Sequence, residues 1–297
     1  MQTFNHIGLA GRLSSEKAQK TTHKLIDFLR ANDVEVIISN ELAESLGRKD
    51  VPFGDEYFIG TNSDLVIVVG GDGSMLGAAR AMVDHGVPLL GVNRGRLGFL
   101  TDIMPSEIEE KVLAVLNGDY VSEERFMLEM IAVRDGEVIG GGHALNDIVL
   151  HPGEHLRMIE FELYVNDEFV YSQLSDGLIA TTPTGSTAYS LSCGGALMHP
   201  SLDAIGLIPL NAHSLTSRPL VVSGESSVRL LLGEGASHMT VTCDGQLAQQ
   251  VQPNDEVLIR KKGRQLTLIH PSDHNYYETC RRKLGWGTRL IKSHNAS

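Results

Sequence analysis

The chain has 297 residues, of which 42% are hydrophobic and 21% charged, so we expect a globular protein of about two domains. The formal net charge of −12 argues against nucleic acid or an anionic membrane as a partner, because an acidic surface repels phosphates on average. No apolar run approaches the roughly 18 residues that span a bilayer, and the first residues lack the layout of a secretion signal, so we expect a cytoplasmic protein.

The first 124 residues alternate between strand-like and helix-like patterns. The expected strands are 5–10, 34–39, 65–69 and 87–92, and the expected helices are 14–30, 74 to about 84, and 105–117. Residues 42–62 have weak periodicity and several glycines, so we expect a mobile loop with a short helix there. This alternation predicts an α/β domain with a parallel sheet, whose ligands bind at the carboxyl ends of the strands.

A GGDG turn at residues 70–73 connects the buried strand 65–69 to the next helix. Its three glycines allow a tight turn whose N–H groups face a ligand over the helix N-terminus, with Ser74 as the expected cap. Asp72 conflicts with such a phosphate cradle unless a divalent cation neutralises both charges or the carboxylate takes part in the chemistry. On these residues alone, the alternative is that Asp72 only favours the positive end of the helix dipole.

A second glycine-containing turn, NRGRLG at residues 93–98, follows the strand 87–92 and should therefore lie at the same edge of the sheet. Arg94 and Arg96 supply two guanidinium groups to this turn. Either arginine can hold a phosphate oxygen, and an exposed, solvated arginine is the alternative.

From Phe126 onward the pattern changes to strands and hairpins. Asp135-Gly136 and Asn166-Asp167 are type I′ turn signals, which predict hairpins from strands 126–134 with 137–141 and 159–165 with 168–172. Further strand patterns occur at 227–232, 239–243, 256–260 and 265–269. We expect a second, mostly β domain, followed by a helix at 276–284 that docks back on the first domain.

Polar side chains gather in residues 176–195, after a short strand at 178–181. The hydroxyl-bearing residues are Thr182, Thr184, Ser186, Thr187, Ser190 and Ser192. Hydroxyls recognise ribose, phosphate and carboxamide groups without adding charge, and Tyr189 can stack on a flat ring. Asn146 and Asp147 place an amide donor beside a carboxylate acceptor, which suits a ribose diol or an adenine amine. The alternatives are a solvated loop for the first segment and an ordinary turn for the Asn-Asp pair.

The cysteines and two histidine pairs give weaker signals. Cys193, Cys243 and Cys280 are widely spaced without a C-x-x-C pair, so we expect reduced thiols packed as small apolar groups. His151 with His155, and His270 with His274, have the H-x-x-x-H spacing of metal ligands on a helix. Because proline follows the first histidine of each pair, we expect surface or turn histidines and no metal ligands.

Taken together, these motifs resemble the NAD kinases, which transfer the terminal phosphate of ATP to the 2′-hydroxyl of the adenosine ribose of NAD. GGDG at 70–73, NRGRLGFL at 93–100, Asn146-Asp147 and DGLIATTPTGSTAYSLS at 176–192 occur in the family's order and spacing. GGDG also marks phosphofructokinases and lipid kinases, whereas TPTGSTAY is highly specific. Residues 158–176 and the KLGW near the C-terminus resemble the Gram-negative bacterial branch.

The resemblance implies a Rossmann-like, phosphofructokinase-like α/β domain over 1–124, with the tail 274–297 docking on it, and a β-sandwich-like NAD-binding domain over 125–273. It also implies a homodimer or homotetramer, and Mg²⁺ or another divalent cation together with ATP. Asp72 would accept the proton of the 2′-hydroxyl, with Gly73 beside it. The other NAD-binding residues would be Asn146, Asp147, Arg157, Leu174, Asp176, Thr187, Ala188, Tyr189, Ser190, Leu191, Ser192 and Gln246. No residue is expected to be a dedicated metal ligand.

Two residues depart from the family pattern. Asp147 stands where glutamate is usual and is one methylene shorter, so its hydrogen bond requires a shifted backbone or a water. Leu174 stands where the Gram-negative branch commonly has arginine, at a position linked to discrimination between NAD and NADH.

The resemblance agrees with the chemistry of the GGDG turn, because phosphoryl transfer depends mainly on positioning and charge neutralisation. A carboxylate that takes the hydroxyl proton typically contributes about 10²- to 10⁴-fold. Two alternatives remain, namely a GGDG-type kinase for a sugar or lipid and a non-catalytic dinucleotide-binding sensor. A sensor has no evident use for Asp72, and a dehydrogenase would need a glycine fingerprint that this turn lacks.

Overall fold

The structure is a computed structural model that describes residues 4–11, 13, 16–95, 97–153, 158–234 and 238–286. The chain forms two compact units. The first contains the described parts of residues 1–75, 89–122 and 269–297, and the second contains those of 76–88 and 123–268. The domain boundaries expected after residues 124 and 273 stay a prediction.

The first unit is built on a seven-stranded sheet with the order β3-β2-β1-β4-β5-β19-β6. Its strands are β1 (His6–Ala10), β2 (Glu35–Ser39), β3 (Phe53–Gly54), β4 (Leu65–Val69), β5 (Leu89–Val92), β6 (Tyr120–Arg125) and β19 (Leu266–Pro271). The pairs β1–β2, β2–β3, β1–β4 and β4–β5 are parallel. The order 3-2-1-4-5 is that of doubly wound nucleotide-binding sheets, which bind ligands where the strand order reverses, here between β1 and β4.

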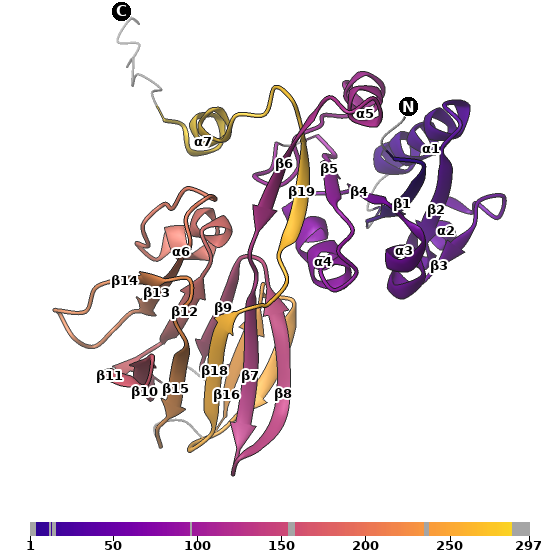
Figure 1. Cartoon of the computed structure of the whole chain (residues 1–297). Helices are drawn as coiled ribbons and strands as arrows, with labels where there is room; N and C mark the ends of the chain where they lie inside the picture. Colours follow the sequence, from indigo (N-terminus) through magenta and orange to yellow (C-terminus); the bar gives the residue numbers. More distant parts are fainter. Residues whose placement is uncertain are drawn as a thin grey trace, which may run out of the picture. The chain divides into compact units, whose positions relative to one another are not determined.

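Helices cover both faces of this sheet (Figure 1). They are α1 (Glu16–Ala31), α2 (Asn40–Leu46), α3 (Glu56–Asn62), α5 (Ile108–Leu116) and α7 (Tyr276–Leu284). A further helix, α4 (Asp72–Met82), begins in the first unit and continues into the second. Leu25 of α1 and Val112 of α5 belong to one core cluster with alternating strand residues such as Ile67. On the opposite face, α3 packs so close to β1 that a Cβ added at Gly8 would lie 2.6 Å from Ile59 Cγ2.

The expected loop at 42–62 is wrong, because this segment holds most of α2, the short strand β3 and all of α3. The Ser39 hydroxyl caps α2 by accepting from the Leu42 amide, and the Asp55 carboxylate caps α3 by accepting from the Phe58 amide. Each helix has only seven residues, which is too short for a clear apolar period, so the capping residues are the stronger sequence signal.

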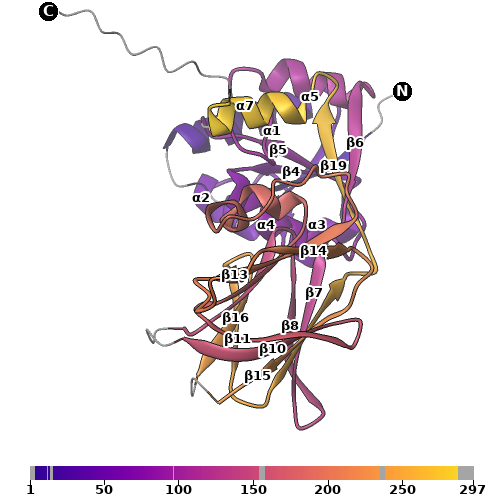
Figure 2. The same cartoon turned by 90° about the vertical axis from the view of Figure 1, so that its left-hand side faces the viewer.

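The second unit is a β-sandwich of two antiparallel six-stranded sheets, as the sequence resemblance implied (Figures 1 and 2). One sheet has the order β11-β10-β15-β18-β7-β8, and the other β14-β13-β12-β9-β16-β17. Phe161 and Leu230 of the first sheet share one core with Ile148 and Val241 of the second. The strands of the first sheet are β7 (Leu128–Arg134), β8 (Glu137–Ala144), β10 (Ile159–Val165), β11 (Glu168–Ser175), β15 (Val228–Leu232) and β18 (Glu256–Lys261). Those of the second are β9 (Asp147–His151), β12 (Gly177–Thr181), β13 (Ala204–Leu210), β14 (Leu220–Ser223), β16 (Met239–Cys243) and β17 (Leu247–Val251).

Both predicted hairpins are confirmed. Strands β7 and β8 pair antiparallel across Asp135 and Gly136, whose φ angles are 51° and 81°. Strands β10 and β11 pair across Asn166 and Asp167, with φ angles of 52° and 64°. Positive φ at both central residues is what a type I′ turn requires.

The helices and the cysteines can also be compared with the expectations from the sequence. Within the described residues, every helix is too short or too polar to cross a membrane. All three cysteines carry free thiols, with Cys243 and Cys280 buried, as the sequence predicts.

Candidate functional site

The GGDG turn joins the fully buried strand β4 to α4 in the first unit. The Gly70 amide donates to Val92 O of β5, and the Gly71 carbonyl accepts from the amides of Ser74 and Met75. Helix α4 therefore begins at Asp72, and Ser74 lies inside its first turn, so the expected capping role of Ser74 is wrong. The helix N-terminus follows the carboxyl end of β4, beside the point where the strand order reverses.

The Asp72 carboxylate is held by the segment that follows β5. Oδ2 accepts from the Phe99 amide and Oδ1 from the Leu100 amide, both at 3.0 Å. Gly98 makes this approach possible, because a Cβ there would lie 2.1 Å from Asp72 Oδ1. Each carboxylate oxygen has two lone pairs, so this half-buried group can accept further hydrogen bonds from a ligand.

The turn at residues 93–98 is organised by a buried asparagine. Asn93 donates from Nδ2 to Thr101 Oγ1 and accepts from the Gly95 amide at Oδ1. Of the two arginines considered as phosphate ligands, Arg94 is half-buried and Arg96 lies outside the described residues.

In the second unit, one carboxylate organises the Asn146-Asp147 loop. Asp244 Oδ1 accepts from the amides of Asn146 and Asp147, and Oδ2 accepts from the Leu145 amide. The side chain of Asp244 is fully buried and pairs with Arg80, with 2.7 Å between Nη1 and Oδ2. Asp244 and Gly245 form the β16–β17 turn with φ angles of 53° and 61°.

The hydroxyl-rich segment is fixed against the same loop. Thr182 donates from Oγ1 to Leu145 O, and its amide donates to Asn146 O. A Cβ at Gly185 would lie 2.1 Å from Asn146 O, so only glycine fits there. The segment forms a 3₁₀ turn (Thr184–Thr187) and the short helix α6 (Tyr189–Ser192).

These elements line a cavity of about 1300 Å³ in the second unit. Seven of the predicted NAD-binding residues line this cavity, namely Asn146, Asp147, Leu174, Asp176, Ala188, Tyr189 and Ser192. Such a volume exceeds the upper end of the roughly 300–1,000 Å³ typical of drug-sized ligands and suits a dinucleotide. Tyr189 is 49% exposed, so its ring is available for stacking.

The other predicted residues have different surroundings. Thr187 donates back to Thr184 O, Ser190 is fully buried beside Gly195, and Leu191 is half-buried outside the cavity lining. Gln246 accepts a hydrogen bond from Arg80. Asp72 and Gly73 belong to the first unit, and Arg157 lies outside the described residues.

Several cavity residues were not among the ligand-binding residues expected from the sequence. Asn211 donates to the Asp176 carboxylate at 2.8 Å, and His151, Cys193 and Asp244 also line the cavity. The sequence Cys-Asp-Gly-Gln around Asp244 indicates only a hairpin turn. The partner of Asp244, Arg80, is 164 residues away and was therefore not predictable from this motif.

Burial raises the pKa of two neighbouring aspartates, Asp147 and Asp244. Burial raises the pKa of the Asp147 carboxyl to about 7, and the nearby Asp244 carboxylate adds to this rise. Burial also raises the pKa of Asp244, although the amides of Asn146 and Leu145 and the Arg80 guanidinium oppose it. Asp147 can therefore change its charge near neutral pH.

Two family models match this chain. "ATP-NAD kinase N-terminal domain" matches residues 7–120, and "ATP-NAD kinase C-terminal domain" matches residues 145–271. The NAD kinase of Teredinibacter turnerae is 55% identical over 289 residues, covering 97% of this chain and 99% of that protein. The NAD kinase of Saccharophagus degradans is 54% identical over 290 residues, covering 97% and 98%.

Solved structures of similar fold are also found. Yeast NADH kinase complexed with NADH aligns with a TM-score of 0.88 and 26% identity, covering 97% of this chain and 90% of that one. An NAD kinase from Archaeoglobus fulgidus in complex with ATP aligns with a TM-score of 0.70 and 24% identity, covering 94% and 97%, which shows a shared fold.

Asp244→Asn should lower the free energy of unfolding by about 3–5 kcal/mol, because it leaves the largely buried Arg80 guanidinium without its counter-charge. Denaturant titration measures this change. Asp27→Asn is the control, since Asp27 is 66% exposed beside Arg48 and its loss should cost at most about 1 kcal/mol. Equal losses in the two variants would contradict the role given to Asp244.

Asp147→Asn should stabilise the chain relative to the wild type, by an amount that grows as the pH rises from about 4 to 7. The unfolded carboxyl ionises near pH 3.8, whereas the folded one stays protonated until about pH 7, so the wild type loses a few kcal/mol across this window. Denaturant titrations at several pH values measure the difference. A difference that does not change with pH would contradict the raised pKa.

Proposed function

This chain belongs to the NAD kinase family, and from that premise we propose how its residues share the reaction. The enzyme phosphorylates NAD at the 2′-hydroxyl of the adenosine ribose with ATP as donor, giving NADP. In our proposal Asp72 accepts the hydroxyl proton, and the cavity of the second unit binds the dinucleotide. The family match leaves the two alternatives, a sugar or lipid kinase and a dinucleotide sensor, without support.

The observation that carries the proposal is the placement of Asp72 at the start of α4. A secondary hydroxyl is a poor nucleophile at neutral pH and becomes a better one when a carboxylate takes its proton as the P–O bond forms. The two amide hydrogen bonds from Phe99 and Leu100 orient the carboxylate and leave lone pairs for the hydroxyl. Because these donors belong to the backbone, the carboxylate does not have to reorganise as the reaction proceeds.

The first turn of α4 supports phosphate binding beside this carboxylate. The N-terminus of a helix carries the positive end of its dipole, which attracts phosphate oxygens. We propose that Mg²⁺ accompanies ATP, and the residues fit this, because Mg²⁺ usually binds through substrate phosphates and one or two carboxylates. When bound, the cation neutralises phosphate charge next to Asp72.

Recognition of NAD falls to the cavity residues in this proposal. Asn146 and Asp147 supply a donor and an acceptor for the adenosine, Tyr189 supplies a stacking surface, and Asp176 supplies an acceptor for a ribose hydroxyl. The short side chain of Asp147 is compensated by the position of its backbone, which Asp244 holds through the Asp147 amide. We also propose a cytoplasmic homodimer or homotetramer, as the sequence resemblance implies.

Asp72→Asn should lower kcat by about 10²- to 10⁴-fold while NAD still binds, because the amide cannot take the hydroxyl proton. Formation of NADP from NAD, ATP and Mg²⁺ measures turnover, and calorimetry measures NAD binding. Asp64→Asn is a matched control, since the Asp64 carboxylate also accepts two backbone amides, those of Asn5 and His6, and should keep kcat near the wild-type value. An active Asp72→Asn enzyme would show that the base lies elsewhere.

Gly98→Ala should lower kcat by roughly 10²-fold, because the new Cβ displaces the Asp72 carboxylate and a shift of about 1 Å is enough for such a loss. The same NADP assay measures it. Gly263→Ala serves as the control, since a Cβ there meets open space. A folded Gly98→Ala enzyme with normal kcat would mean that the position of the Asp72 carboxylate is unimportant.

A further inference from the structure

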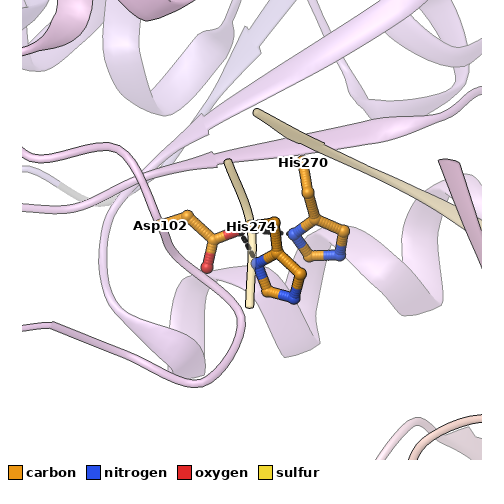
Figure 3. Close-up of side chains that lie close together, drawn as sticks. All are labelled: Asp102, His270 and His274. Atoms are coloured by element: carbon orange, nitrogen blue, oxygen red, sulfur yellow. Dashed lines mark hydrogen bonds and ion pairs between the residues drawn. The ribbon is translucent and has the colours of Figure 1, made fainter. Parts of the chain in front are cut away.

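Two histidines of the H-x-x-x-H segment meet an aspartate in the first unit (Figure 3). His270 lies on β19, His274 lies between β19 and α7, and Asp102 follows the segment that holds Asp72. Of the expected surface or turn positions, the surface position is wrong, because the two side chains are only 2% and 8% exposed, whereas His274 does directly follow a turn. The Asp102 side chain is 13% exposed.

The three side chains bring their potential metal-ligand atoms close together. His274 Nδ1 lies 3.0 Å from Asp102 Oδ2, and His270 Nδ1 contacts the same oxygen. One potential ligand atom from each residue lies within 4.8 Å of the other two. The two imidazole rings are stacked, with centroids 4.0 Å apart and an angle of 25° between their planes. Two imidazoles from one segment thus converge on a single carboxylate oxygen that is far from them in the sequence.

We propose that Asp102, His270 and His274 bind a divalent transition-metal ion such as Zn²⁺. Two imidazole nitrogens and one carboxylate oxygen form a donor set that Zn²⁺ and similar cations prefer over Mg²⁺. Ligand atoms around a tetrahedral Zn²⁺ are about 3.3 Å apart, given bonds of about 2.0–2.1 Å, which is close to the 3.0 Å between His274 and Asp102. Three protein ligands leave the fourth position for a water molecule.

Metal binding at this site requires each neutral imidazole to carry its proton on Nε2, so that Nδ1 can bind the ion. With its proton on Nε2, each neutral imidazole presents the lone pair of Nδ1 to the cation, and the Asp102 carboxylate supplies a negative oxygen. The ion would then replace the two contacts that the imidazole rings make with Asp102. No oxidation or covalent step is involved.

The ion would join three parts of the first unit. The turn that precedes His274 is already attached to α5, because Lys111 of α5 pairs with Asp273 at 3.1 Å. The end of α7 contacts the segment 97–102, since Lys283 donates to Leu97 O. Asp102 comes two residues after Leu100, whose amide holds Asp72. The metal would therefore strengthen the attachment of α7 to the segment 97–102, and this role does not depend on the proposed function.

The test uses full-length, untagged protein that has been freed of metal with EDTA. Titration with Co²⁺ should give visible d–d bands that saturate at one ion per chain and disappear when Zn²⁺ is added. Because the ligands are nitrogen and oxygen, the sulfur-to-cobalt charge-transfer band of a cysteine site should be absent. A wild-type protein that binds neither Co²⁺ nor Zn²⁺ at one equivalent would overturn the proposal, without reference to any variant.

Variants locate the site. His274→Asn and Asp102→Asn should weaken Co²⁺ binding by more than the roughly 10- to 100-fold that loss of an outer-shell partner costs, and should abolish the rise in melting temperature that Zn²⁺ gives the wild type. His6→Asn is a matched control, because exposed His6 also lies beside two carboxylates, those of Glu35 and Asp64. Bands lost in His6→Asn but kept in the folded His274→Asn protein would show surface binding and overturn the proposal.

Discussion

The hydrogen bonds from Phe99 and Leu100 to the Asp72 carboxylate are the interaction on which the proposed role of the first unit depends. A carboxylate at a phosphate-binding helix N-terminus is unfavourable unless something holds it in one orientation. Two backbone amides do this here, and Gly98 leaves the space that they need. The sheet places β4 and β5 side by side, so the turns after these strands meet at one edge.

A second carboxylate organises the other unit in a similar way. Asp244 accepts three backbone amides from residues 145–147 and pairs with Arg80, so its charge is satisfied although it is fully buried. Its function is to fix a loop, whereas Asp72 retains access for a ligand. The difference lies in burial and in partners, since Asp72 is half-buried and accepts hydrogen bonds from the backbone amides of Phe99 and Leu100.

Local patterns predicted most of the fold. The strand–helix alternation and the two type I′ turns depend on neighbouring residues, and both appear in the structure. The helices α2 and α3 were missed because seven residues are too few to establish a period. The positions of β13 and β14 in the sandwich were likewise not predicted, because their apolar runs lack the turn signals of the other hairpins.

The site residues too were predicted where they lie in local motifs and missed where they depend on distant partners. Asn146, Asp147 and Tyr189 lie in motifs that the sequence displays, and they line one cavity. Asp244 was missed because its partner Arg80 is 164 residues away, and the burial of His270 was missed because it depends on contact with Asp102, 168 residues away. Long-range pairs of this kind arise from the fold, so single motifs do not reveal them.

The surroundings of Asp147 argue for recognition and against a role as the base. Its pKa of about 7 would suit a general base, but the cause is burial next to Asp244, in a loop that fixes its backbone. A hydrogen-bond donor of the ligand would stabilise the charged form and lower the pKa of Asp147. If NAD binds here as proposed, binding near neutral pH would release a proton into solvent, and the affinity for NAD would increase as Asp147 ionises. Asp72, by contrast, is oriented before any ligand arrives, which is the property that a base acting on a ribose hydroxyl requires.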